Sequence, residues 1–297
     1  MPEAEHIRIA VASGKGGTGK TLVATNLFQA LTNSGLHVRL ADCDAEAPNA
    51  VIFFDAARGR SFEVSQKVPV IDEDLCTYCG KCQEFCNYHA IFILPPARII
   101  RVMDDLCHAC GACSVACTFG AIREKDVVLG EVTRFAIANT RNTLVETRTK
   151  PGAFSPVNVI KAGIREVGSK GIVILDAPPG TSCPFIHTVH QADFVVLVTE
   201  PTPFGLSDLK QSVDTLKTMD KRFGVVVNRA GLGDREVYDY LEQRGIPLLM
   251  EIAFERKIAT VYARGGLLAS IDPLWQMRFY SLFEKIMHEY GNGNHQR

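Results

Sequence analysis

Short continuous runs of hydrophobic residues alternate with amphipathic stretches along most of this chain. The runs have the length of strands buried on both faces, and they lie at residues 7–12, 37–41, 172–175, 194–198, 224–227 and 248–252. The stretches carry apolar residues at helical spacing, at residues 20–32, 155–168, 206–219, 234–243 and 256–264. Strands alternating with helices predict an α/β fold with a mostly parallel sheet flanked by helices.

Residues 273–290 form the last amphipathic stretch. A helix here would place on one face Trp275, Phe279, Leu282, Phe283, Ile286 and Tyr290. Such a face either lies on a membrane surface or packs against a sheet. The remaining positions include acidic as well as basic residues with no basic excess, which favours packing. Membrane association is therefore not expected.

A duplicated, cysteine-rich segment interrupts the alternation between residues 68 and 128. Residues 74–82 match residues 105–113, and the α/β pattern resumes after the segment. The segment therefore interrupts one domain rather than joining two in tandem. We predict a discontinuous α/β domain at residues 1–67 and 129–297, with a small α+β domain inserted at residues 68–128.

The duplicated segment holds two cysteine runs with the pattern C-x2-C-x2-C-x3-C. This is the spacing of bacterial ferredoxins, where the fourth cysteine of each run serves the other cluster. Zinc sites also use C-x2-C pairs, but seldom three cysteines in succession at this spacing. The runs predict a ferredoxin domain with two [4Fe-4S] clusters, one bound by Cys76, Cys79, Cys82 and Cys117 and the other by Cys86, Cys107, Cys110 and Cys113.

A glycine-rich segment follows the first predicted strand and precedes the first predicted helix. It fits the pattern G-x4-G-K-T, in which backbone N–H groups and the helix N-terminus hold nucleotide phosphates. Lys20 is expected to contact the β- and γ-phosphates, and Thr21 to bind Mg²⁺. The predicted ATP or ADP site comprises Gly14, Lys15, Gly16, Gly17, Thr18, Gly19, Lys20 and Thr21.

With its additional lysine at position 15, this loop resembles the deviant P-loop of the MinD/ParA/Mrp/nitrogenase-iron-protein ATPases. Residues 42–49 (DCDAEAPN) and 176–181 (DAPPGT) resemble the two switch motifs of that superfamily. The resemblance covers nearly the whole chain and is strongest to members with an inserted ferredoxin domain. In this superfamily the early lysine reaches the nucleotide of a dimer partner. The resemblance therefore implies a homodimer, or a heterodimer with a related ATPase.

The resemblance also implies roles for individual residues. The catalytic residues would be Lys15, Lys20 and Asp44, with Asp44 orienting the attacking water. The residues that hold Mg²⁺ would be Thr21, Asp44 and Asp176. Asn228 would contact the nucleotide base, and Asp42 would support the first switch.

Two cysteines lie outside the duplicated runs. Cys43 lies between the aspartates of the first switch and needs no role beyond packing. Cys183 follows the second switch, about where the nitrogenase iron protein has a ligand for the cluster that bridges its dimer. Two interpretations of Cys183 therefore remain: a ligand for a metal at a dimer interface, and a cysteine with no special role.

Composition and charge limit the classes of partner. The formal net charge of −1 gives no general attraction to nucleic acid, so no nucleic-acid partner is expected. Residues 1–6 are polar and lack the pattern of a signal peptide, and ten cysteines at these spacings suit metal ligation rather than disulfides. We expect a cytoplasmic protein.

Three functions agree with these features. The first is a slow ATPase that binds ATP or ADP, Mg²⁺ and two [4Fe-4S] clusters, and whose nucleotide state controls electron transfer to a redox partner protein. The second is an ATP-dependent factor for assembling iron–sulfur clusters. The third is a positioning ATPase of the MinD/ParA type with structural or redox-sensing clusters.

Overall fold

The computed structural model describes residues 6–153 and 155–292. In this part of the chain the main sheet has nine strands in the order β11-β10-β9-β1-β8-β2-β7-β6-β3. Pairing is parallel from β11 to β7, whereas β6 is antiparallel to both β7 and β3. The strands are β1 (Ile7–Ala12), β2 (Val38–Asp42), β3 (Ala56–Ile71), β6 (Ile122–Ile137), β7 (Thr143–Thr149), β8 (Ile172–Asp176), β9 (Phe194–Thr199), β10 (Phe223–Ala230) and β11 (Leu248–Ala253).

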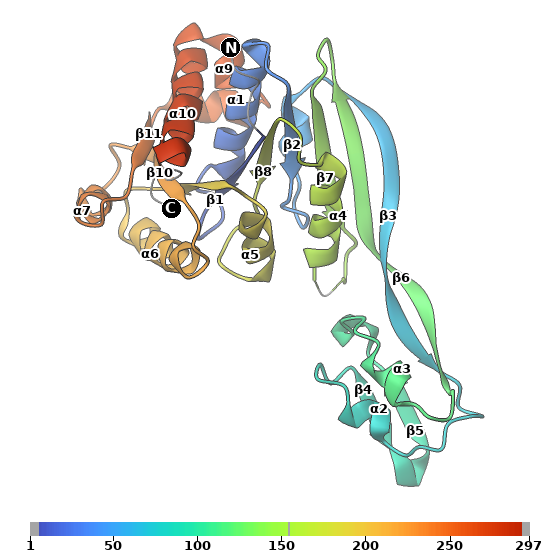
Figure 1. Ribbon diagram of the computed structural model, residues 1–297. Coiled ribbons are helices and arrows are strands. Elements are labelled where there is room, and N and C mark those ends of the chain that lie inside the picture. The colour runs from blue at the N-terminus through green and yellow to red at the C-terminus, as the bar shows by residue number, and fades with distance from the viewer. Residues whose placement is uncertain (1–5, 154, 293–297) are drawn as a thin grey trace.

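Helices cover both faces of this sheet (Figure 1). One face carries α1 (Lys20–Asn33), α8 (Arg256–Ala263), α9 (Leu268–Ile271) and α10 (Pro273–Asn292). The other face carries α4 (Val157–Val167), α5 (Cys183–His190), α6 (Pro203–Thr218) and α7 (Glu236–Gln243). A short 3₁₀ helix, η1 (Ala50–Phe53), follows β2. The predicted α/β architecture with flanking helices is therefore confirmed.

Alternate residues of each central strand pack into different cores, because successive side chains point to opposite faces of a sheet. In β1, Ile9 and Val11 join the core beneath α1 and α10, whereas Ala10 and Ala12 join the core beneath α4 and α6. Burial on both faces explains why the central strands are continuous hydrophobic runs in the sequence.

The apolar face of α10 packs into the core shared with α1. Trp275, Phe279, Leu282 and Ile286 are all buried there. The helix therefore packs on the sheet, as the balance of its charges predicts. No helix in the described residues is both long and apolar enough to cross a bilayer.

Strands β3 and β6 form a long antiparallel hairpin that extends beyond the rest of the sheet (Figure 1). The sequence analysis did not predict β3, β6 or β7. Both hairpin strands run through the boundaries expected at residues 67 and 129, so the insertion begins within a continuous pair of strands. Apolar residues at Phe62, Val64 and Val68 follow the alternation expected of a strand. The exposed charged residues around them make this pattern weak.

The cysteine-rich segment lies at the end of this hairpin. Its elements are α2 (Lys81–Glu84), β4 (Ile91–Leu94), η2 (Pro95–Ala97), β5 (Ile99–Val102), η3 (Asp104–Leu106) and α3 (Ala112–Ala116), with β4 and β5 paired as a small antiparallel sheet. The backbone repeats the duplication seen in the sequence. Tyr78 and Ala109 both have φ of 54°, and Gly80 and Gly111 precede α2 and α3 with φ of 82° and 73°.

Replacement of Phe279 by alanine should lower the free energy of unfolding by about 3–5 kcal/mol, since the ring is fully buried between helix and sheet. Guanidinium unfolding followed by circular dichroism measures the change. Met277→Ala, on the same helix but with its side chain 63% exposed, is the control and should change stability by less than about 0.5 kcal/mol. Equal effects of the two substitutions would contradict the packing of α10.

Candidate functional site

The glycine-rich loop joins β1 to α1 at the carboxyl edge of the sheet. Gly14 approaches the backbone of Asp208 so closely that a Cβ atom would lie 2.5 Å from the Asp208 carbonyl oxygen. Gly19 has φ of 99°, and a Cβ there would collide with the side-chain amide of Asn228. Only glycine satisfies both positions. The loop is thus fixed by its neighbours with its backbone N–H groups at the start of α1, which suits phosphate binding.

Three carboxylates surround the ammonium group of Lys20. Burial lowers the pKa of Lys20, and the charges of Asp176, Asp44 and Asp42 oppose that shift. Burial also raises the pKa of Asp176 to about 7, against the effect of the nearby Thr21 hydroxyl and Lys20. Burial raises the pKa of Asp44 as well. The site therefore holds acidic groups that a bound cation would stabilise in their charged form.

Asp176 is the residue best placed to face a ligand. It ends β8, and both of its carboxylate oxygens are buried without a hydrogen-bond partner in the described part of the chain. Buried polar atoms normally have partners, so these oxygens point to a group that binds between the loop and the switch. Thr21, Asp44 and Asp176 lie at one edge of the sheet with oxygen donors, the ligands that Mg²⁺ requires.

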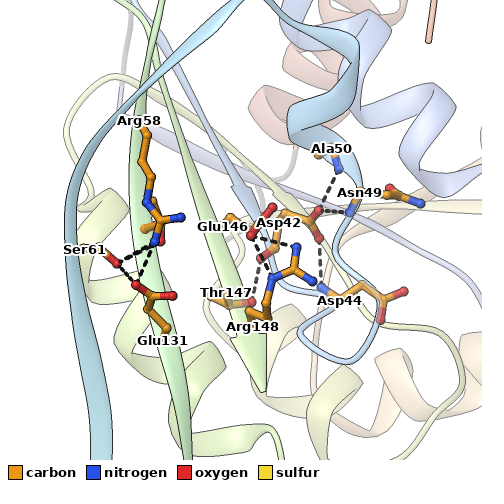
Figure 2. Close-up of polar contacts among 11 residues, drawn as sticks. Asp42, Asp44, Asn49, Ala50, Arg58, Ser61, Glu131, Glu146, Thr147 and Arg148 are labelled. Atoms are coloured by element: carbon orange, nitrogen blue, oxygen red, sulfur yellow. Dashed lines mark hydrogen bonds and ion pairs between the residues drawn. The ribbon is translucent and has the colours of Figure 1, made fainter. Parts of the chain in front are cut away.

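Asp42 holds the first switch in place. Its Oδ2 accepts hydrogen bonds from the backbone N–H groups of Asn49 and Ala50, each at 2.8 Å, and its Oδ1 accepts one from Asp44 at 3.1 Å (Figure 2). Asp42 also lies beside Asp176 in the register of β2 and β8. The supporting role expected for Asp42 therefore matches its contacts, and Asp44 is left facing the site.

The second switch is joined to the phosphate-binding loop through its backbone. The Gly180 N–H donates to the carbonyl of Ser13 at 3.1 Å, and the Ala177 N–H donates to Val11 at 2.9 Å. Gly180 has φ of 89°, which glycine adopts without strain. A change at the nucleotide phosphates would therefore be transmitted directly to this segment.

Lys15 contacts residues of its own chain. Its Nζ lies 3.6 Å from Oε2 of Glu200, a residue just after β9, and Oε1 of Glu200 pairs with Arg229 at 2.6 Å. Arg229 in turn donates to the carbonyl of Gly17 at 3.4 Å. Glu200 thus holds two cations beside the loop, one on each side of its carboxylate.

Asn228 lies within β10 rather than at its end, because the strand continues to Ala230. Its side-chain amide donates to the carbonyl of Thr18 at 2.7 Å. The residue therefore supports the phosphate-binding loop directly and lies next to the nucleotide site.

The cysteines surround two separate spaces in the segment at the end of the hairpin. Each space is lined by the first three cysteines of one run and the fourth of the other, in the sets Cys76, Cys79, Cys82 and Cys117, and Cys86, Cys107, Cys110 and Cys113. Backbone N–H groups point at the sulfurs, from Tyr78 to Cys76 at 3.4 Å and from Ala109 to Cys107 at 3.4 Å. Such bonds stabilise thiolates bound to iron.

Among the described residues, no three His, Cys, Asp or Glu side chains come close enough together to hold a single metal ion. A [4Fe-4S] cluster has a different requirement, because its four cysteines stand around a cage of iron and sulfide rather than around one ion. Two partly open spaces, each bordered by four cysteines, fit that requirement.

Residues 9–268 match the family described as the CobQ/CobB/MinD/ParA nucleotide binding domain. The chain belongs to this family. The matched residues include the phosphate-binding loop, both switch motifs and Asn228, so the resemblance to MinD/ParA-type nucleotide-binding domains is confirmed. The protein is therefore a nucleotide-binding domain of the MinD/ParA type.

Curated relatives of this MinD/ParA-type chain come from several organisms. An uncharacterized protein of Methanocaldococcus jannaschii is 32% identical over 230 residues, which are 77% of this chain and 80% of that protein. A second uncharacterized protein of that organism is 28% identical over 88% of this chain and 91% of its own. An iron–sulfur cluster carrier protein of Pyrococcus abyssi is 26% identical over 74% of this chain and 60% of its own.

Solved structures of the family show the same fold. The cell division ATPase MinD of Pyrococcus furiosus has a TM-score of 0.57 and 21% identity, covering 96% of this chain and 99% of its own. The septum site-determining protein MinD of Pyrococcus horikoshii, complexed with Mg-ADP, has a TM-score of 0.58 and 18% identity. The match covers 94% of this chain and 95% of that protein. At these identities the likeness concerns the fold alone.

The structure adds residues to this MinD/ParA-type site that the sequence analysis missed. Glu200 could have been suspected from its position directly after a buried strand. The ring of Tyr262, in α8, packs against the ring of Phe53, with 4.8 Å between the ring centroids. Burial and the charge of Asp176 raise the pKa of the Tyr262 hydroxyl to about 12. No local pattern marks Tyr262, because it reaches the site from a helix more than two hundred residues after the loop.

Lys20→Ala should weaken MgATP binding by about ten- to a hundredfold, because a charge-assisted hydrogen bond to phosphate contributes about 1.5–3 kcal/mol. Isothermal titration calorimetry with a non-hydrolysable ATP analogue measures the affinity. Lys257→Ala, an exposed lysine in α8, serves as the control and should bind as the parent does. Unchanged binding by Lys20→Ala would show that the loop does not hold phosphate.

Proposed function

We propose that this protein is an ATP-hydrolysing iron–sulfur protein in which the nucleotide state controls electron transfer through two [4Fe-4S] clusters. The observation that carries the proposal is the arrangement of the eight cysteines. They line two spaces in crossed sets, in a segment joined by two continuous strands to the sheet that holds the nucleotide site. The cysteine-rich segment is thus connected to the MinD/ParA-type domain through two strands of the main sheet.

The nucleotide half of the proposal uses groups already in place. Lys20 and the loop N–H groups would bind the phosphates, Thr21, Asp44 and Asp176 would hold Mg²⁺, and Asp44 would orient the attacking water. Phosphoryl transfer needs positioning and charge neutralisation rather than covalent catalysis by the protein. The buried, unpartnered oxygens of Asp176 support the assignment of the metal side of the site.

The redox half relies on the clusters for its chemistry, since each [4Fe-4S] cluster would accept and release one electron. The chain would supply the thiolates, backbone N–H donors and apolar neighbours such as Ile91, Ile93 and Ile100. These are the features through which a protein sets the potential of a cluster. Asn87 and Thr118 stand where ferredoxins usually have proline, so the potentials need not match those of an ordinary ferredoxin.

Anaerobic redox titration followed by electron paramagnetic resonance tests the proposal. Two cluster signals are expected, and at least one midpoint potential should differ between MgADP and a non-hydrolysable MgATP analogue. Lys20→Ala is the control, because it should show both clusters but no response to nucleotide. Potentials and partner electron-transfer rates that are identical in all nucleotide states would refute control by the ATPase.

A second candidate is delivery of a cluster to an acceptor protein. It is favoured by the similarity to the iron–sulfur cluster carrier protein of Pyrococcus abyssi, although that similarity covers only 60% of the carrier. The two candidate functions differ in whether the clusters stay bound to the protein. ATP-dependent loss of clusters to an apo-acceptor would favour delivery, whereas clusters retained through many turnovers would favour electron transfer.

Lys15→Ala should retain nucleotide binding but lower the hydrolysis rate by about 10³-fold, if Lys15 acts on a partner's phosphates as an arginine finger does. Lys15 lies 3.6 Å from the buried Glu200 carboxylate, which keeps Arg229 at 2.6 Å as a partner, so departure of the lysine would not leave that carboxylate unpaired. Phosphate release, measured over a range of protein concentrations, gives the hydrolysis rate of the variant and shows whether hydrolysis depends on dimer formation. The parent should show a rate per chain that rises with concentration, and equal turnover by parent and variant would remove the dimer assignment.

A further inference from the structure

The two cysteine-lined spaces have different surroundings, although the backbone around them is duplicated. The space bordered by Cys117 is lined mainly by apolar residues, among them Ile71 and Ile122 at the end of the hairpin. The space bordered by Cys86 also meets Lys67 and Glu124, which lie further along the hairpin towards the ATPase sheet. Of the two spaces, the second is therefore the nearer to the nucleotide domain along these strands.

A glutamine joins this nearer space to the nucleotide domain. The side-chain amide of Gln66, in β3, donates to the carbonyl of Cys107 at 2.9 Å. The amide of Asn158, in the first turn of α4, donates to the side-chain oxygen of Gln66 at 3.4 Å. Gln66 thus bridges a ligand loop and a helix of the ATPase. No such bridge reaches the equivalent residue Cys76 in the part of the chain that the structure describes.

Helix α4 is in turn tied to the first switch. Gly163 lies so close to the methyl group of Thr147 that a Cβ atom would collide with it. The hydroxyl of Thr147 donates to the backbone carbonyl of Asp42 at 2.7 Å (Figure 2). The next residue but one, Thr149, donates its N–H to the carbonyl of Ala45, inside the switch, at 2.8 Å. The switch, β7 and α4 therefore form one packed unit.

We propose that Gln66 couples the nucleotide state to the cluster held by Cys86, Cys107, Cys110 and Cys113, and that the other cluster does not respond. This inference rests on the proposed function, because it supposes that clusters occupy both spaces. Movement of the first switch displaces β7 and α4 together. The displacement reaches the Cys107 loop because Asn158 and Gln66 are joined by directional hydrogen bonds, which tolerate little change in geometry. Gln66 acts as a positioning residue.

Hydrogen–deuterium exchange of the cluster-loaded protein tests the coupling without relying on electron transfer. The comparison is between MgADP and a non-hydrolysable MgATP analogue, in peptides covering residues 105–113 and the duplicate residues 74–82. The parent should show a nucleotide-dependent change in exchange at residues 105–113 and little at 74–82. Gln66→Leu should lose that difference while retaining both clusters, nucleotide affinity and the exchange response of residues 42–49.

Gln83→Leu is the matched control, since it removes an exposed glutamine amide from α2 and should behave as the parent does. An equal response of both loops in the parent, no response in either, or a response that persists in Gln66→Leu would each overturn the coupling. A response at residues 105–113 with unchanged cluster potentials would leave the coupling standing and refute only electronic control by the ATPase.

Discussion

The buried carboxylate of Asp42 is the contact on which the arrangement of both halves of the molecule depends. Burial and the neighbouring Asp176 raise the pKa of Asp42 well above its ordinary value, while N–H donors from Ala50, Asn49 and Asp44 oppose the rise. Three hydrogen bonds to one carboxylate, each worth about 1.5–3 kcal/mol if it is charged, fix the course of the first switch. The path of the first switch places Asp44 at the nucleotide site. Beyond the switch, the chain continues through η1 into β3 of the hairpin.

A packed connection begins at the same residue. The carbonyl of Asp42 accepts from Thr147, and the strand that carries Thr147 pairs with β6 of the hairpin. Beside this connection, Arg58 in β3 pairs with Glu131 in β6 at 2.9 Å, close to a bulge in the hairpin (Figure 2). Exposed ion pairs add little stability, so the pairing of the strands themselves must hold the hairpin together. A paired hairpin keeps the cysteine-rich segment at a defined place, as a flexible linker could not.

The sequence allowed the central strands and the phosphate-binding loop to be predicted because their physical requirements are local. A strand such as β1 must be apolar throughout when both faces are buried, and Gly14 and Gly19 are needed wherever the backbone passes close to a neighbour. Strands β3 and β6 escaped prediction because charged, exposed residues interrupt their apolar pattern, and β7 because it buries polar residues such as Glu146 and Thr147 beside its two apolar ones. Glu200 and Tyr262 escaped because their roles arise from contacts between residues distant in sequence. The grouping of the cysteines was predicted from their spacing together with the crossed ligation of ferredoxins, whereas the different surroundings of the two spaces could not be predicted from either.

Duplication and insertion have opposite consequences for the two cysteine sets. Duplication gives both sets the same backbone, as the shared φ values of Tyr78 and Ala109 show. Insertion at the end of a hairpin places the sets at different distances along it, and among the described residues the Gln66 bridge to α4 meets the set that contains Cys107. A cluster bound near Gln66 would feel a displacement of α4, and one bound beside Ile71 would be shielded by apolar side chains. The asymmetry needed for directed electron transfer would thus arise from where the duplicated segment is attached, with no change in the ligands themselves.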